Sequence, residues 1–289
     1  MFKKSGIFFI IVIVLFSACK KYETDTISGN VPPPDGPINN VTVENYVNKV
    51  YISVLGRKPD SVELNSGMSV LTKNNLSAAN RTQFLDSVFN HPEYYDHLYN
   101  TALSDLLNSL DTNNIPQYLA IFQPLLLDSA YIQSWNQLRF EITRLDSMRV
   151  IPTELKSGAI NAIEMQKRCI NNYFYDQINM GAANFVISSF LHFLNRAPTT
   201  NELTQGENIV NGTPGTLFLQ VGQSKQDYLA IFFSSLNYFE GEAVLLYNKY
   251  LFRNPTSVEM TNAATKFQSI LDYIQLQKDI LSTNEYIGI

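Results

Sequence analysis

The chain has 289 residues, of which 45% are hydrophobic and 16% are charged, and its formal net charge is −5. This acidic balance argues against nucleic acid or an anionic membrane face as a partner, because both are held mainly by lysine and arginine. The length suffices for one large core or two small ones. With only Cys19 and Cys169, disulfides are not expected to stabilise the fold, and Cys169 is expected to be a small buried hydrophobic residue.

The N-terminal segment has the order of a secretory signal. Lys3 and Lys4 precede an apolar run from Ile7 to Phe16, and small residues then lead to Cys19. The run is about ten residues long, whereas a bilayer-spanning helix needs about 20. The segment resembles a bacterial lipoprotein signal (residues 1–18), in which Cys19 is lipidated and becomes the mature N-terminus. The alternative is an ordinary secretory signal with an incidental cysteine, since Phe16 departs from the usual lipoprotein pattern.

Residues 19–41 are predicted to form a flexible tether. They lack apolar periodicity, and the run Pro32-Pro33-Pro34 favours an extended conformation. Two or more acyl chains on Cys19 would anchor the protein stably in a lipid bilayer. No aspartate stands directly after Cys19, which by resemblance to lipoproteins of diderm bacteria favours the outer membrane; the periplasmic and the cell-surface face both stay open.

An eight-residue pattern of Arg-x-Pro followed by Glu occurs three times. Apolar or aromatic residues stand at the positions ten, six and two before each arginine, and this spacing places them on one face of a helix. The proline ends that helix, and the arginine is expected to complement its dipole. A capping box that ends on the glutamate then opens a second helix, with Asp60, Thr199 and Thr256 as N-caps. The copies contain Arg57, Pro59 and Glu63; Arg196, Pro198 and Glu202; and Arg253, Pro255 and Glu259. A structural role is favoured over an anion-binding groove lined by the arginines.

A second motif closes each unit with a tyrosine, and the three are Tyr94, Tyr238 and Tyr286. Each follows an apolar pair, and the spacings Asn90–Glu93 and Ser282–Glu285 predict capping boxes. The tyrosines are expected to anchor the core. The alternative is that Tyr94-Tyr95 and Tyr238-Phe239 form an exposed aromatic surface for a sugar or a partner.

These motifs predict an all-α fold, a repeat-built helical bundle on a lipidated, proline-rich tether. Residues 42–99 form the first repeat, 100–184 a helical insert without an assignable counterpart, and 185–289 the fused second and third repeats. In the fused pair one helix closes a unit and opens the next. Within the insert, Tyr131–Leu145 and Gly158–Met180 are predicted to be helical.

The first repeat resembles a known kind of helical module. Leu55-Gly-Arg-Lys-Pro-Asp60 with Phe84-Leu85 and His91-Pro-Glu-Tyr94 is similar to the "LLGR-x-P … SPEY" modules. These occur in uncharacterised bacterial surface-protein repeats, in phycobilisome linkers and beside cytochrome-like modules of planctomycete proteins. The resemblance implies an all-helical module that mediates assembly or adhesion.

No catalytic, cofactor-binding or metal-binding residue is predicted. His91, Glu93 and His97 are spaced like metal ligands, but structural histidines are the favoured interpretation. Neither a P-loop, a Gly-x-Ser-x-Gly elbow nor a Cys-x-x-Cys-His heme site occurs. We expect a non-enzymatic cell-envelope lipoprotein that acts as an interaction or assembly scaffold with envelope protein partners. The alternatives are a surface glycan- or small-ligand-binding lipoprotein for nutrient capture, and a hydrolase with convergent carboxylates.

Overall fold

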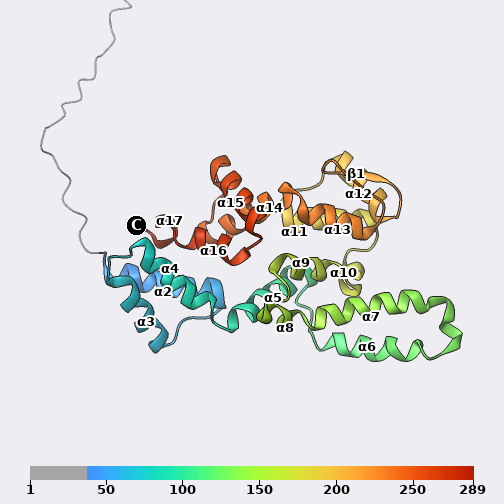
Figure 1. The fold of residues 1–289 in the computed structure, drawn as a ribbon, viewed down its shortest axis with the longest axis horizontal. Coiled ribbons are helices and arrows are strands. Elements are labelled where there is room, and N and C mark those ends of the chain that lie inside the picture. Colours follow the sequence, from blue (N-terminus) through green and yellow to red (C-terminus); the bar gives the residue numbers. More distant parts are fainter. Residues whose placement is uncertain (1–37) are drawn as a thin grey trace, which may run out of the picture. The chain divides into compact units, whose positions relative to one another are not determined.

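Helices form nearly all the regular structure of residues 38–289, the part of the chain that the computed structural model describes (Figure 1). The prediction of an all-α fold is confirmed. The signal segment, Cys19 and most of the predicted tether lie outside the described residues. The tether was predicted to reach residue 41, but α2 already begins at Asn40, because the Asn39 side chain caps its first turn.

The predicted unit of helix, Arg-x-Pro turn, helix, connection, helix and capped helix appears three times. The first repeat contains α2 (Asn40–Leu55), α3 (Ser61–Thr72), α4 (Ala78–Phe89) and α5 (Glu93–Leu107). The second contains α11 (Ala182–Leu194), α12 (Thr200–Val210), α13 (Lys225–Ser234) and α14 (Leu236–Leu251). The third shares α14 and adds α15 (Ser257–Ile270), α16 (Tyr273–Leu281) and α17 (Asn284–Ile287).

A small antiparallel hairpin in the second repeat was not predicted. Strands β1 (Gly215–Leu217) and β2 (Gln220–Gly222) pair between α12 and α13. Their two-residue turn has positive φ at Phe218 and Leu219, which are not typical turn residues. The sequence therefore carried no turn signal at this position.

The three capping boxes of the Arg-x-Pro motif are confirmed, with Asp60, Thr199 and Thr256 as N-caps. The capping boxes predicted for the closing motif are wrong. Pro92 stands at the N-cap of α5 without a side-chain hydrogen bond, and Thr283 rather than Ser282 caps α17. In α14 and α17 the residue three positions before the tyrosine, Ser235 or Thr283, supplies the cap, so the cap predicted for α17 was shifted by one residue.

The insert is continuous with the first repeat. Helix α5 passes through the predicted boundary at residues 99 and 100 and ends at Leu107. The insert contains α6 (Asn114–Leu125), the 3-10 helix η1 (Ser129–Ser134), α7 (Trp135–Arg149), α8 (Ile151–Ser157), α9 (Ala162–Ile170) and α10 (Tyr173–Ile178). The helix predicted over Gly158–Met180 is split, because Asn172 turns out of α9 and caps α10. The run predicted from Tyr131 becomes α-helical only at Trp135.

The insert also hides a fourth copy of the closing motif. Helix α9 has the length of α16, each helix of the pair α9 and α10 has a side-chain N-cap as α16 and α17 do, and a tyrosine is the third residue of both α10 and α17. The two helix pairs share equivalent residues: Asn161 and Asp272, Gln166 and Gln277, Lys167 and Lys278, Asn172 and Thr283, and Tyr175 and Tyr286. Residues 38–178 (the first half) and residues 181–289 (the second half) are therefore two versions of one arrangement.

The contacts between the halves are reciprocal. The Tyr286 hydroxyl of the second half lies 2.9 Å from Ser53 Oγ of α2, and the Tyr175 hydroxyl of the first half lies 3.0 Å from His192 Nδ1 of α11. Ser53 and His192 each stand four residues before a motif arginine. Two other reciprocal pairs are the edge-to-face ring contacts Tyr46–Tyr286 and Phe185–Tyr175, and the cation–π contacts Lys278–Phe89 and Lys167–Phe233. This is the pattern of an approximate internal two-fold, with η1, α7 and α8 as the part that the second half lacks.

Candidate functional site

The motif arginines bind the glutamates of their own capping boxes. Arg196 donates two hydrogen bonds to Glu202, at 2.8 and 2.7 Å, and Glu202 also accepts from the backbone N–H of Thr199 at 2.8 Å. Arg57 with Glu63 and Arg253 with Glu259 repeat this arrangement. The bidentate pairs hold the pKa of each of the three glutamates at about 2.

The side-chain hydrogen bonds of these arginines thus go to the helix that follows, and their complementing the dipole of the preceding helix stays a prediction. Each arginine follows the C-cap residue, and its planar guanidinium matches the carboxylate of the next helix better than the preceding carbonyls. Arg57 and Arg253 use their remaining Nε–H groups on Glu93 and Glu285. With these donors occupied, the alternative of an anion-binding groove loses its support.

The closing tyrosines are core residues. The exposed fractions of Tyr94, Tyr238 and Tyr286 are 2%, 0% and 5%. The alternative of an exposed aromatic surface is wrong, because Phe239 is also buried and Tyr95 is half-buried.

Each buried hydroxyl reaches across to the other half. The Tyr94 hydroxyl donates to Gln277 Oε1 at 2.9 Å, the Tyr238 hydroxyl donates to Gln166 Oε1, and Tyr286 pairs with Ser53. The two glutamines are equivalent residues of α9 and α16, so these bonds are again reciprocal.

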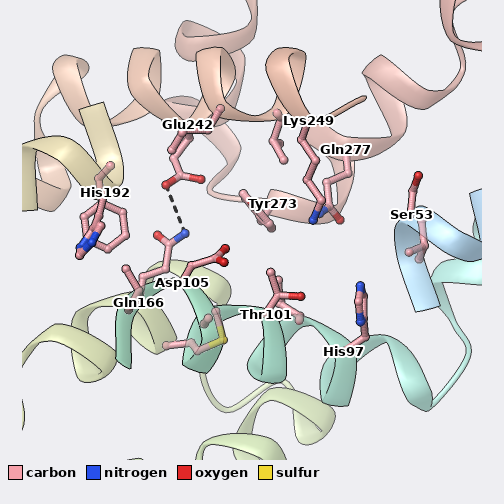
Figure 2. A pocket seen from close by; sticks show the side chains of 18 of the residues that line it. Ser53, His97, Thr101, Asp105, Gln166, His192, Glu242, Lys249, Tyr273 and Gln277 are labelled. Carbon is pink, nitrogen blue, oxygen red and sulfur yellow. Dashed lines mark hydrogen bonds between the residues drawn. The ribbon is translucent and has the colours of Figure 1, made fainter. Parts of the chain in front are cut away.

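A cavity of about 270 Å³ lies where the halves meet (Figure 2). Its walls come from α5 and α9 on one side and from α14 and α16 on the other, with α2 and α11 at the two ends. The polar residues on its walls are Ser53, His97, Thr101, Asp105, Gln166, His192, Glu242, Lys249, Tyr273 and Gln277.

Equivalent positions of the two halves form this cavity, but their chemistry differs. On α5 and α14 the equivalent pairs are Leu98 and Glu242, Thr101 and Leu245, Ala102 and Leu246, and Asp105 and Lys249. The helix ends add Ser53 with His192 and Val54 with Phe193. The internal two-fold thus places an acid on one wall where the other wall has an amine.

The most deeply buried charged group is Glu242, with an exposed fraction of 2%. Its Oε1 accepts one hydrogen bond from Gln166 Nε2, at 3.2 Å. Burial raises the pKa of Glu242 to about 8, because the charged form is poorly solvated there. Burial likewise raises the pKa of Tyr273 well above its usual range.

Lys249 and His97 both have lowered pKa values. Lys249 is accessible to solvent, but protein atoms surround it on most sides, and this desolvation lowers its pKa although Asp105 and Glu242 oppose the effect. Desolvation also lowers the pKa of His97, with a further contribution from the Lys249 charge. Among residues 38–289, the side chains of Asp105 and Lys249 form neither an ion pair nor a hydrogen bond.

Metal binding finds no support in the described part of the chain. Residues 38–289 contain no group of three or more His, Cys, Asp or Glu side chains that could hold an ion. His91 instead accepts a hydrogen bond from the Glu93 backbone N–H at 3.3 Å, as expected for a residue of the capping turn. Cys169 is fully buried, and burial raises the pKa of its thiol to about 12.

A second candidate is a surface formed by α6, η1 and α7, residues 114–149, which we call the arm. Helices α6 and α7 pack mainly on each other, and Asp128 is the only charged residue between positions 114 and 138. The arm exposes large apolar side chains along its length: Ile121 (58%), Leu127 (89%), Tyr131 (44%), Ile132 (54%) and Phe140 (38%).

Comparison of the chain with protein-family models, with curated proteins and with solved structures finds no match. Within residues 38–289, no single helix has both the length and the apolar composition to cross a membrane; α13 and α14 together reach these values but are bent by 62°.

Proposed function

We propose that this protein is a non-enzymatic cell-envelope lipoprotein that acts as an interaction or assembly scaffold. Acylated Cys19 anchors it in the outer membrane, and the arm docks an envelope protein partner. The exposed apolar arm is the observation that carries this proposal. The resemblance of the repeats to helical modules of assembly proteins supports it.

The composition of the arm is that of an interface core. Interface cores are depleted of charged residues and enriched in aromatic residues, whereas contiguous exposed apolar surface is uncommon on monomeric proteins. The arm has one charge over two thirds of its length and exposes Ile121, Leu127 and Ile132. Since the second half folds without an equivalent of η1 and α7, these parts of the arm, which expose Ile132 and Phe140, are an addition to the shared arrangement. An addition that exposes apolar surface is best explained by binding.

Copurification tests the proposal. The native lipoprotein is isolated in mild detergent, and its companions are identified by mass spectrometry. We expect one or a few stoichiometric envelope proteins. The triple variant I121S/L127S/I132S should lose them while keeping the helical circular dichroism of the native chain, because these side chains contribute little to the core.

The matched control replaces three equally exposed apolar residues outside the arm, as V62S/V221S/V258S. It should retain the partner. Equal recovery with the arm variant, or no companion with any variant, contradicts the proposal. Binding of the Cys19→Ala protein to lipid vesicles, lost only in the arm variant, would instead identify the arm as a membrane-contacting surface.

A second candidate function is the capture of a small ligand. The central cavity favours it, because ionisable side chains from both halves converge there. The exposed aromatic surface considered for a glycan at Tyr94-Tyr95 and Tyr238-Phe239 loses its support, because three of these side chains are buried and Tyr95 is half-buried.

A further inference from the structure

The central cavity contains both signs of charge without pairing them. Glu242 and Lys249 lie on one wall, and Asp105 lies on the other (Figure 2). They are close enough for the charge of Asp105 to act on Lys249, yet no ion pair within 4.0 Å joins any of the three. Burial disfavours the ionised form of Glu242, and partial desolvation disfavours the ammonium of Lys249, because neither group has an opposite charge bound to it. A molecule that carries both signs would supply each of them with that charge.

The spacing of the charges sets the length of such a molecule. Glu242 and Lys249 are seven residues apart on α14, which at 1.5 Å per residue separates their backbone positions by about 10.5 Å, and both side chains extend from this helix toward the cavity (Figure 2). A charge-assisted hydrogen bond at each end takes about 2.8 Å. About 5 Å remain between the ammonium and the carboxylate of the ligand. This is the span of a dipeptide, and it is too long for a single α-amino acid.

We propose that the cavity binds a small zwitterionic molecule, a dipeptide or an ω-amino acid of the same length, with its ammonium at Glu242 and its carboxylate at Lys249. Thr101 supplies a hydroxyl group for the middle of the ligand. The volume of about 270 Å³ leaves room for a molecule smaller than a typical drug. This site is separate from the arm, so it does not depend on the scaffold proposal.

The protonation state of Glu242 predicts that ligand binding releases a proton. With a pKa of about 8 in the free protein, the carboxyl is mostly protonated at pH 7. A ligand ammonium stabilises the ionised form and lowers this pKa. Binding at pH 7 should therefore release close to one proton.

Isothermal titration calorimetry of the full-length protein with glycylglycine tests the proposal. We expect a Kd of about 1 mM or tighter. Affinity should fall by about 10-fold or more for N-acetylglycylglycine, which lacks the ammonium, and for glycylglycine amide, which lacks the carboxylate. Glycine should bind as weakly as these. If 4-aminobutanoate binds as tightly as glycylglycine, the two charges alone account for recognition. If it binds more weakly, the peptide group contributes as well. Either result supports the proposal.

Two variants test which side chain binds each end of the ligand. K249M should lower the affinity for glycylglycine by about 10-fold or more. E242Q should lower it equally and should also abolish the dependence of the binding enthalpy on the buffer, which reports proton release. The surface variants K73M and E44Q remove the same charges outside the cavity and should bind as the native protein does. The arm variant should also bind normally, so failure of either proposal leaves the other intact.

Three results would overturn the inference. One is that none of these probes binds. Another is that the blocked derivatives bind as well as glycylglycine. The third is that K249M and E242Q bind with native affinity.

Discussion

Replacement of Glu202 by glutamine tests whether the Arg–Glu pairs stabilise the repeats through charge. The pKa of Glu202 falls from 4.5 to about 2, mainly because of the two hydrogen bonds from Arg196. At 1.36 kcal/mol per unit, this shift corresponds to about 3.4 kcal/mol. Since the Arg196 side chain is 38% exposed, solvent screening reduces the expected cost of E202Q to about 1–2 kcal/mol. The amide oxygen of glutamine can still accept from Thr199, so the cap itself remains.

The pH dependence of this stability difference distinguishes an electrostatic contribution from a packing contribution. A lowered native pKa contributes stability that is complete above pH 4.5 and is lost as pH falls toward 2. The difference in unfolding free energy between native protein and E202Q should therefore be full at pH 7 and vanish near pH 2. Urea unfolding followed by circular dichroism measures it at each pH. The Glu207 side chain lies on the same helix and forms no hydrogen bond or ion pair within residues 38–289, so E207Q is the control and should be near neutral. A difference that persists at pH 2 would refute the electrostatic explanation.

Three other predictions concern the core. Tyr238→Phe should lower the unfolding free energy by about 1–3 kcal/mol in urea titrations, because it leaves Gln166 Oε1 buried without its donor; an unchanged midpoint would contradict this. Gly241→Ala should lower the unfolding free energy by about 3 kcal/mol in the same assay, because a Cβ at this position would lie 2.0 Å from the Phe193 carbonyl oxygen. Native stability of this variant would show that α11 and α14 are not so closely packed. In a chain without the N-terminal cysteine, Cys169 should react with a disulfide reagent at pH 8 only as fast as the protein opens, so reaction at the rate of a small thiol would show that it is accessible.

The predictable part of the fold depends on local signals. The Arg-x-Pro turn and its capping box lie within eight residues, so Asp60 and Glu63 determine the start of a helix whatever surrounds them. Burial of the closing tyrosines was expected from their place in the closing motif, directly after an apolar pair and a short turn. These features need only neighbouring residues and could be predicted from the sequence.

The fourth copy of the closing motif was not predicted because the Arg-x-Pro motif that precedes the other copies is absent there. Asn108 ends α5 in the left-handed conformation, as Phe252 ends α14, but Ser109 follows where the other copies have an arginine. What remains is a Gln-Lys pair nine residues before a tyrosine, at Gln166 in the first half. Such a sparse pattern is visible only once the structure aligns it.

The cavity was missed for another reason. Glu242 occupies a helical position at which the first half has Leu98, and nothing in the adjacent sequence distinguishes a buried glutamate from a surface one. Its burial depends on α9, which is 76 residues away at Gln166. Propensity and periodicity do not contain this information.

The reciprocal contacts have a consequence for how the chain folds. Tyr94 meets Gln277 across 183 residues, and Ser53 meets Tyr286 across 233. Closing loops of this length costs chain entropy before the contacts repay it, and high contact order slows folding. The capped helix pairs can form early and locally, whereas each half completes its core only when the other is present. The two halves should therefore gain hydrogen-exchange protection together, in one late cooperative step.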